Sequence, residues 1–225
     1  MLARVYCWAG EYGNAYKEAK EVVDATYSTG STSTASCFNF SNSLTTNRKD
    51  YNSIIMTFFK STCYEDYLPY MTKGNDVVLV VNTTNLFGDE AGADDRNLDL
   101  FGDWDGGDIK YSFKYDIKEG TSGTDMIPAI RLSEMYYIMG EYFAYKDEFS
   151  KAGEMLDKVR YARGISTTNL ASSIGSLEVF HTHLIKEMRR EFVGEGQMFF
   201  QYKRLDQKPK DNVVFVFDKP NNEDI

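Results

Sequence analysis

The sequence predicts a mainly α-helical protein in which helical hairpins carry an irregular insertion with a few short β-strands. Three observations support this fold class. They are amphipathic helical patterning near both ends, a repeated spacing of small and aromatic residues, and a middle region rich in Ser, Thr, Gly and Asp. We expect one domain portion with a helical scaffold over residues 1–27 and 127–205, a loop-rich insertion over 28–126, and a strand and tail over 206–225.

A repeated spacing links the two helical blocks. The pattern falls on Ala3, Tyr6, Ala15, Ala19 and Val22, and again at the same offsets on Gly140, Phe143, Ala152, Leu156 and Val159. Small residues at such positions let the two helices of a hairpin approach closely, while an aromatic side chain fills the space between them. This is the spacing of tetratricopeptide repeats, so we predict tetratricopeptide-like hairpins in both blocks. Two unrelated amphipathic hairpins are the alternative.

A third helix is predicted near the C-terminal end of the scaffold. Apolar residues recur there at steps of three and four and form one stripe: Leu177, Phe180, Leu184, Met188 and Phe192. A charged face lies beside the stripe, formed by Glu187, Arg189, Arg190, Glu191 and Glu195. Alternating charges of this kind predict ion pairs within the helix and with neighbouring helices.

The insertion alternates turn-rich and extended segments. Residues 28–46 include 11 Ser or Thr among 19, a composition that favours turns. Residues 86–108 carry five Gly and eight acids against one Arg, which predicts a mostly solvated loop. Short strands are expected from β-branched runs or alternation at 76–81, 111–117 and, beyond the insertion, 213–217.

Composition and charge exclude several classes of protein. With 25 Lys and Arg against 34 Asp and Glu, the net charge is −9, so the chain lacks the basic face of a nucleic-acid-binding protein. No apolar run reaches the roughly 18 residues of a membrane-spanning helix. Two histidines, His181 and His183, and three cysteines without CxxC spacing argue against a zinc site. The disulfide state of Cys7, Cys37 and Cys63 stays open. Because the opening residues already carry helical patterning, we expect the chain to be the later part of a longer protein.

Two glutamates, Glu134 and Glu141, lie two turns apart on one face of a predicted helix. Two carboxylates facing an open cleft would suit glycoside hydrolysis. Apolar residues flank both positions, however, and a buried carboxylate needs a cationic partner. We therefore favour ion pairs between stacked helices, with arginines on neighbouring segments as partners: Arg131, Arg160, Arg163, Arg189 and Arg190.

Five segments share their order and spacing with one protein family. They are LARVYCWAGEYGNAYKEAKEVVD, Asp95-Arg96 with Phe101 and a following Lys114-Tyr115, IPAIRLSEMYYIMGEYFAYKDEFSKAGEMLDKVRYARG, IKEMRREFVGEGQMFFQYKRL and FVFDKPNNEDI. Together they resemble the C-terminal part of the SusD/RagB family of outer-membrane nutrient-binding lipoproteins. Three residues depart from the family pattern, which often has Arg, Asp and Pro at these positions: Gln197, Gln201 and Asp218.

The resemblance implies a SusD-like α-α superhelix without catalytic activity. It implies binding of an oligosaccharide or other nutrient at the bacterial cell surface, for delivery to a TonB-dependent transporter of the SusC type. It also implies a surface-exposed outer-membrane lipoprotein, held to the membrane only through an N-terminal lipid anchor that is not present in this chain. The residues indicate no cofactor, metal or nucleic-acid partner. Two alternatives are a tetratricopeptide-type protein-interaction scaffold and a glycoside hydrolase, the latter favoured only by the acid content.

Ligand-binding residues are expected in the acidic loop: Trp104, Phe101, Asp103, Asp105 and Arg96. An exposed indole suits the flat C–H faces of sugars, and carboxylates accept hydrogen bonds from sugar hydroxyls. Two alternatives concern the same segment. Trp104 folds back onto the helices as an anchor, or the acids of 103–108 bind calcium, although they lack the alternating ligand spacing of a calcium loop.

Overall fold

The computed structural model describes residues 1–29, 33–71, 80–103, 109–115 and 125–205, and the predicted mainly α-helical fold with few short strands is confirmed there. The described helices are α1 (Leu2–Trp8), α2 (Tyr12–Val23), α3 (Cys63–Met71), α4 (Thr83–Phe87), α5 (Asp95–Leu100), α6 (Leu132–Ala144), α7 (Phe149–Ala162), α8 (Leu177–Glu191) and α9 (Met198–Arg204). The described strands are β1 (Thr26–Ser28), β2 (Thr34–Ser36), β3 (Ile54–Phe59), β4 (Val80–Asn82), β5 (Phe101–Asp103), β6 (Ile109–Ser112) and β7 (Met126–Arg131).

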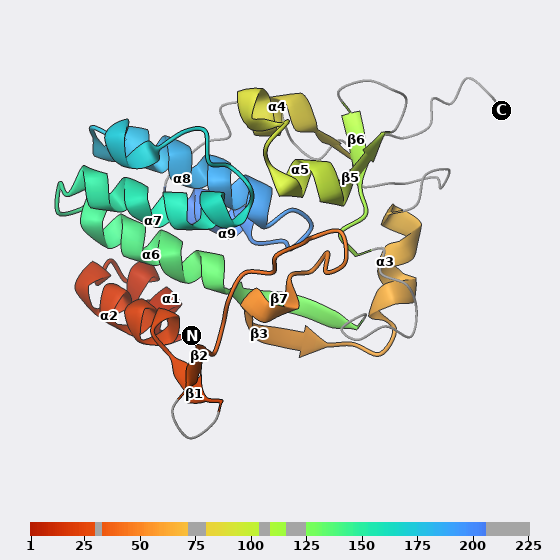
Figure 1. Ribbon diagram of the computed structural model, residues 1–225, viewed down its shortest axis with the longest axis horizontal. Coiled ribbons are helices and arrows are strands. Elements are labelled where there is room, and N and C mark those ends of the chain that lie inside the picture. Colours follow the sequence, from red (N-terminus) through yellow and green to blue (C-terminus); the bar gives the residue numbers. More distant parts are fainter. Residues whose placement is uncertain (30–32, 72–79, 104–108, 116–124, 206–225) are drawn as a thin grey trace.

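Two helical hairpins, α1–α2 and α6–α7, form the scaffold, and α2 packs against α6 (Figure 1). Their turns share one backbone conformation. Gly10 has φ +75° and Asp147, at the equivalent position of the second hairpin, has φ +59°. The next residues, Glu11 and Glu148, both have φ −86°, with ψ of 60° and 58°. The repeat predicted from residue spacing is therefore a structural repeat, extending to the turn.

Small residues at the repeat positions bring the helices close together. Ala15 and Ala19 in α2 and Ala152 in α7 are fully buried. A Cβ added to Gly140 of α6 would lie 3.1 Å from the ring of Phe180 in α8, tighter than ordinary contact. The predicted third helix is α8, and its apolar stripe completes the main core with Leu156, Val159 and Tyr137. Figure 1 shows α2, α6, α7 and α8 lying side by side as one helical layer.

The described part of the insertion contains, beside α3, α4 and α5, three small antiparallel sheets: β1–β2, β3–β7, and β4-β6-β5 in that strand order. In Figure 1 the β3–β7 and β4-β6-β5 sheets lie on the side of the molecule opposite the hairpin turns, whereas the β1–β2 ribbon projects below α1 and α2. The β3–β7 ribbon runs directly into α6, since β7 ends at Arg131 and α6 begins at Leu132. A separate apolar cluster joins the insertion to the end of α8, formed by Leu44, Val81, Leu86, Phe87, Leu100, Phe101 and Val193.

The prediction of a solvated loop over residues 86–108 was wrong for the part that is described. Two short helices, α4 and α5, form there, capped by the side chains of Asn82 and Asp94, which accept hydrogen bonds from backbone N–H groups. Part of the segment is buried, because Glu90 and Asp94 pair with arginines as described below, whereas Asp89 and Asp103 stay exposed. Within the expected strand segments, β4 begins only at Val80 and β6 ends at Ser112, while residues 76–79, 116–117 and 213–217 lie outside the described ranges.

All three cysteines are free thiols, Cys7 and Cys63 being buried and Cys37 exposed. Among the described helices, none combines the length and the apolar character needed to cross a bilayer.

Candidate functional site

The candidate ligand-binding residues lie where α5 runs into β5. Asp94 caps α5 by accepting a hydrogen bond from the backbone N–H of Arg96 at 3.0 Å, and β5 then pairs with β6. A Cβ at Gly102 would lie 2.8 Å from the ring of Tyr111 in β6, so the glycine lets this ring lie directly against β5. Trp104 and Asp105 follow β5 directly but lie outside the described residues, so their role in binding stays a prediction.

The other three candidates fall into different environments. The side chain of Asp103 is 70% exposed at the end of β5, with one carboxylate oxygen 3.6 Å from Nζ of Lys110. Phe101 is buried and meets the ring of Phe87 edge to face, with centroids 5.8 Å apart. Arg96 is 1% exposed. Asp103 is therefore presented to solvent, whereas Phe101 and Arg96 support the end of β5 from inside.

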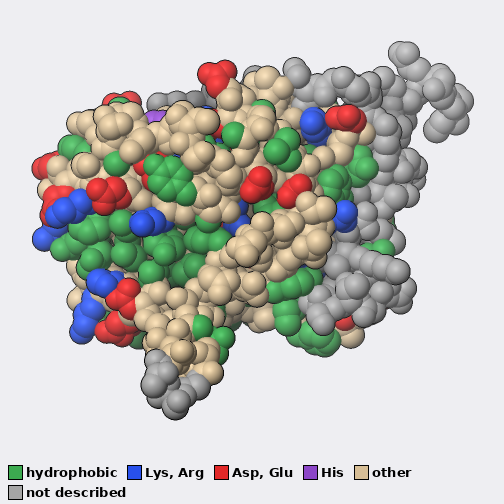
Figure 2. Space-filling view, viewed as in Figure 1, with side chains coloured by type: hydrophobic (Ala, Val, Ile, Leu, Met, Phe, Trp, Pro, Cys, Tyr) green, Lys and Arg blue, Asp and Glu red, His purple; other side chains and the backbone are tan. Residues whose placement is uncertain are grey.

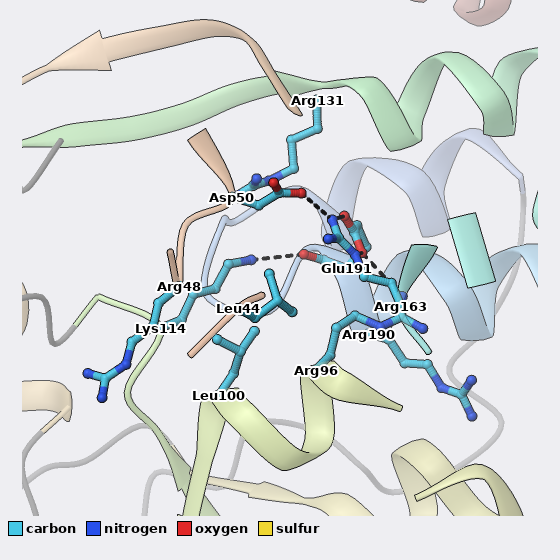
Figure 3. A pocket seen from close by; sticks show the side chains of 10 residues that line it. All are labelled: Leu44, Arg48, Asp50, Arg96, Leu100, Lys114, Arg131, Arg163, Arg190 and Glu191. Carbon is cyan, nitrogen blue, oxygen red and sulfur yellow. Dashed lines mark hydrogen bonds and ion pairs between the residues drawn. The ribbon is translucent and has the colours of Figure 1, made fainter. Parts of the chain in front are cut away.

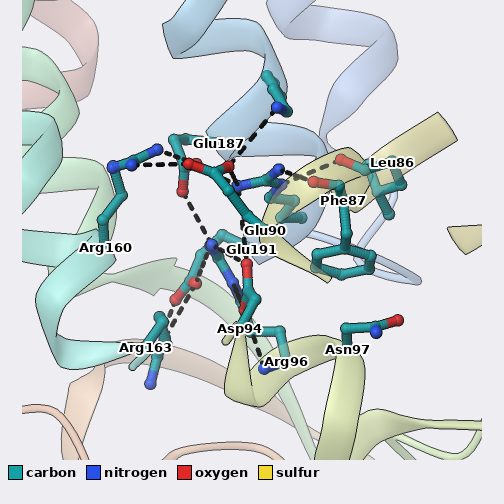
Figure 4. Close-up of polar contacts among 12 residues, drawn as sticks. Leu86, Phe87, Glu90, Asp94, Arg96, Asn97, Arg160, Arg163, Glu187 and Glu191 are labelled. Carbon is teal, nitrogen blue, oxygen red and sulfur yellow. Dashed lines mark hydrogen bonds and ion pairs between the residues drawn. The ribbon is translucent and has the colours of Figure 1, made fainter. Parts of the chain in front are cut away.

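Arg96 belongs to a buried ion-pair network at the junction between the insertion and the helical scaffold (Figure 4). Its cations are Arg96, Lys114, Arg131, Arg160, Arg163 and Arg190. Its carboxylates are Asp50, Glu90, Asp94, Asp157, Glu187, Glu191 and Glu195. Charges buried to this degree persist only when paired and hydrogen-bonded.

The guanidinium of Arg96 joins α5 to α8. Its Nε and Nη2 donate to the two oxygens of Asp94 at 2.9 and 2.8 Å, a bidentate arrangement. Nη2 also donates to Glu187 at 2.9 Å, and Nη1 donates to Glu191 at 3.2 Å. One side chain therefore connects three carboxylates, two of which lie one turn apart on α8.

Further pairs bind the rest of the insertion. Arg163, just after α7, donates to Asp50 at 2.7 Å. Nη2 of Arg131 at the end of β7 and Nζ of Lys114 lie 2.6 and 2.7 Å from the same oxygen of Glu195. Asp50 precedes β3, Lys114 follows β6 and Glu195 follows α8. These ion pairs therefore attach three connecting segments to the same buried network.

Arg190 of α8 donates hydrogen bonds to the free backbone carbonyl groups at the C-terminal end of α4. It donates to the carbonyl oxygens of Leu86 at 3.0 Å and Phe87 at 2.8 Å, which have no partner within so short a helix. Its Nη1 also lies 2.8 Å from Glu187 and 2.7 Å from Glu90. The acidic segment is therefore held by a scaffold arginine through both its backbone and a side chain.

The network encloses a cavity of only about 10 Å³ (Figure 3). This is room for about one water molecule, so no sugar enters it. Burial would raise the pKa of Glu191, but Arg163 and Arg96 hold it well below its usual range. Burial also lowers the pKa of Lys114 to about 8, despite the opposing effect of Glu195. The arrangement is suited to fixing the position of the insertion rather than to binding a substrate.

Glu134 and Glu141 are in ion pairs, as predicted, but the predicted partners were wrong. Arg4 of α1 donates to Glu134 at 2.5 Å, and Arg204 of α9 donates to Glu141 at 2.6 Å. Both arginines come from helices that flank α6. The arginines expected as partners lie in other contacts, and Arg131, Arg160, Arg163 and Arg190 belong to the buried network.

Sequence patterns did not identify five members of the network: Asp50, Glu90, Asp94, Lys114 and Asp157. Asp94 and Glu90 stand among other acids in a glycine-rich segment, and composition gives solvated and buried acids the same appearance. Asp50 has φ +51°, a conformation that Asp tolerates better than most residues, but no sequence feature marks it. In the described residues, no group of three or more His, Cys, Asp or Glu side chains is placed to hold a metal ion.

The chain resembles known proteins over nearly its whole length. The model of the SusD family matches residues 3–222. Among curated proteins, none matches the chain.

Solved structures from three Bacteroides species share its fold. A SusD superfamily protein from Bacteroides thetaiotaomicron is 24% identical with a TM-score of 0.65, covering 92% of this chain and 48% of that one. Surface glycan-binding protein A from Bacteroides uniformis is 17% identical with a TM-score of 0.63, covering 96% and 52%. A SusD-like carbohydrate binding protein from Bacteroides vulgatus is 19% identical with a TM-score of 0.59, covering 92% and 44%. This chain therefore spans about half the length of these structures.

Proposed function

Since this chain belongs to the SusD family, we propose that it binds an oligosaccharide or other nutrient at the bacterial cell surface without converting it. The bound nutrient passes to a TonB-dependent transporter of the SusC type. The observation that carries this proposal is the family match along residues 3–222. The names of two structures with the same fold, a surface glycan-binding protein and a carbohydrate binding protein, support a sugar as the ligand.

The end of β5 is the place where we expect the ligand. Asp103 presents its carboxylate to solvent there, and Trp104 and Asp105 follow it in the chain. A carboxylate accepts hydrogen bonds from sugar hydroxyls, and an indole packs against the C–H face of a sugar ring. The buried network beneath this segment holds β5 at a fixed position, which lowers the entropy lost on binding.

The absence of catalysis is supported by the environment of the glutamates that could have served a hydrolase. Glu134 and Glu141 are both buried and paired with arginines. Glycoside hydrolysis needs two carboxylates flanking a sugar in an open cleft. The same family membership supports a location at the outer membrane, as a surface-exposed lipoprotein.

Isothermal titration against a panel of plant and host oligosaccharides tests this function. We expect one glycan class to bind, and Trp104→Ala and Asp103→Asn to weaken that binding. Asp89→Asn, which neutralises an exposed acid elsewhere in the insertion, is the matched control and leaves affinity unchanged. Unchanged affinity in Trp104→Ala would remove the site at β5, and sugar products in the same mixtures would contradict a purely binding role. Co-purification with a SusC-like transporter tests the delivery step.

One observation favours the second candidate, a protein-interaction scaffold. Trp8 of α1 and Phe199 and Phe200 of α9 are exposed aromatic residues, and the rings of Trp8 and Phe200 lie 6.4 Å apart. Contiguous exposed aromatic groups often mark protein contacts. If no glycan on the panel gives heat of binding, the scaffold function takes precedence.

A further inference from the structure

A groove of about 540 Å³ lies at the end of the helical layer, where the α1–α2 turn meets the α6–α7 turn. It is a shallow, open depression of the surface rather than an enclosed pocket. In Figure 1 these turns are at one end of the longest axis, and β5 is toward the other. The groove is therefore separate from the site proposed at Asp103. Its lining consists of Gly10, Glu11, Tyr12, Gly13, Asn14, Tyr142, Tyr145 and Lys146.

Stacked tyrosines from both hairpins form the aromatic part of the groove. Tyr12 stacks on Tyr145 with centroids 4.0 Å apart and an interplanar angle of 21°. Tyr142, which also lines the groove, is held from behind by Tyr16, a residue outside the lining, with centroids 4.4 Å apart and an interplanar angle of 27°. Such mutual stacking fixes the rings before a ligand arrives, and a fixed aromatic surface binds with little loss of side-chain entropy. Figure 2 shows that hydrophobic side chains gather over α6 in this part of the molecule, between charged residues on either side.

Polar groups of opposite charge surround the tyrosine rings. The carboxylate of Glu11 accepts a hydrogen bond from Nδ2 of Asn14 at 2.7 Å, and both side chains are exposed. The ammonium of Lys146 lies 5.0 Å from the ring centroid of Tyr142. One negative and one positive group leave the groove without net charge. The combination of tyrosine rings with a carboxylate, an amide and an ammonium suits a ligand that has apolar faces and many hydroxyls.

Two glycines keep the groove open. A Cβ at Gly10 or at Gly13 would meet no atom within 4 Å, so both positions face empty space. Gly10 has φ +75°, which the turn requires. Gly13 lies inside α2 with ordinary helical geometry, where glycine costs up to about 1 kcal/mol relative to alanine. The turn does not require this second glycine, which lines the groove at an exposed position.

We propose that this groove is a second carbohydrate-binding site, for neutral pyranose sugars. The C–H faces of the sugar pack against the tyrosine rings, and its hydroxyls are bound by Glu11, Asn14 and Lys146. The argument stands on the groove itself and does not depend on the site at β5. A short peptide is the competing occupant, but tetratricopeptide-like scaffolds bind peptides on an extended concave surface rather than at their turns.

The test uses the Trp104→Ala variant as background, so that only the groove is examined, with cello-, malto- and xylo-oligosaccharides as probes. Titration by calorimetry is expected to show millimolar to micromolar binding of at least one probe. Gly13→Gln fills the groove without removing a contact, so it is expected to fold normally by circular dichroism and to weaken binding at least tenfold. Tyr145→Ala is expected to do the same. Tyr161→Ala removes a tyrosine of similar exposure, 47% against 40%, outside the groove and is expected to leave affinity unchanged.

Three results would overturn the proposal. The first is that no probe binds the Trp104→Ala background; if wild-type protein does bind, the function proposed above survives while the groove site fails. The second is that Gly13→Gln retains the affinity of its background. The third is that a tri- or tetrapeptide of Gly, Ser and Ala binds in the groove while no sugar does.

Discussion

Replacing Arg96 with methionine tests whether the buried network fixes the insertion to the scaffold. Methionine fills much of the same volume but cannot pair with a carboxylate. Asp94 loses both hydrogen bonds from the guanidinium and keeps the one from the backbone N–H of residue 96 at 3.0 Å, while its next cation is Nη1 of Arg190 at 3.7 Å. Glu187 keeps Arg190 at 2.8 Å, and Glu191 keeps Arg163 at 2.5 Å. The substitution therefore leaves one buried carboxylate without a close cation.

The expected loss of stability follows from this one unpaired carboxylate. Breaking a buried pair by removing one partner destabilises by about 3–5 kcal/mol. For a protein of this size, such a loss lowers the melting temperature by roughly 6–20 °C. Exposed ion pairs contribute much less, at most about 1 kcal/mol. Lys151→Met, which breaks the exposed pair with Glu148, is the matched control and should change stability within that limit.

Urea unfolding followed by circular dichroism at pH 7 measures both variants. The double variant Arg96→Met/Asp94→Asn is expected to recover part of the loss, because it neutralises the orphaned carboxylate and keeps an amide able to cap α5. A loss below about 1 kcal/mol for Arg96→Met, equal to that of Lys151→Met, would contradict a fixing role for the network. It would mean that the network is solvated or rearranges without cost.

Three further predictions concern backbone packing, acid stability and thiol reactivity. Gly153→Ala is expected to destabilise the protein by about 1–3 kcal/mol, since its Cβ would lie 2.6 Å from backbone atoms of the 3₁₀-helix η3 (Leu170–Ser172). Gly13→Ala is expected to be neutral or to stabilise the protein by up to about 1 kcal/mol, and thermal melts distinguish the two variants. Burial opposes ionisation of Glu90, but its arginine partners lower the pKa from 4.5 to about 2. The lowered pKa corresponds to a stabilising contribution on the order of 3 kcal/mol, which is present above pH 4.5 and lost as the pH falls toward 2. Urea unfolding should therefore show that the wild type loses more stability over this pH range than Glu90→Gln does. In a timed maleimide reaction Cys37 should be labelled well before Cys7, which is buried and has a raised pKa; equal rates would contradict the buried placement.

The hairpin repeat could be predicted from the sequence because its cause is local. Ala15 and Ala152 are small where two successive helices touch, and that contact depends on spacing within a few dozen residues. The apolar stripe of α8 is local in the same sense, so its burial followed from periodicity alone. The agreement of the turns at Gly10 and Asp147 shows that the repeat includes backbone conformation.

The partners of the charged residues could not be predicted. Arg96 and Glu187 are 91 positions apart, and Arg4 and Glu134 are 130 apart. A carboxylate in a solvated loop and one in a buried pair have the same chemistry in a sequence, and only the tertiary packing decides which is which. For this reason the acidic segment was assigned to solvent, although much of it is part of the core.

The candidate sites also combine features that are local in the sequence with features that depend on tertiary packing. Composition and periodicity report on local structure, so the helical scaffold, the acidic insertion and the aromatic residue within it can be predicted from the residues alone. That Asp103 faces solvent while Arg96 and Phe101 are buried follows from the packing of the folded chain. The same packing brought Tyr12 and Tyr145, from hairpins more than a hundred residues apart, into one groove. A surface assembled from distant segments depends on how the segments pack, and no single stretch of sequence records that packing.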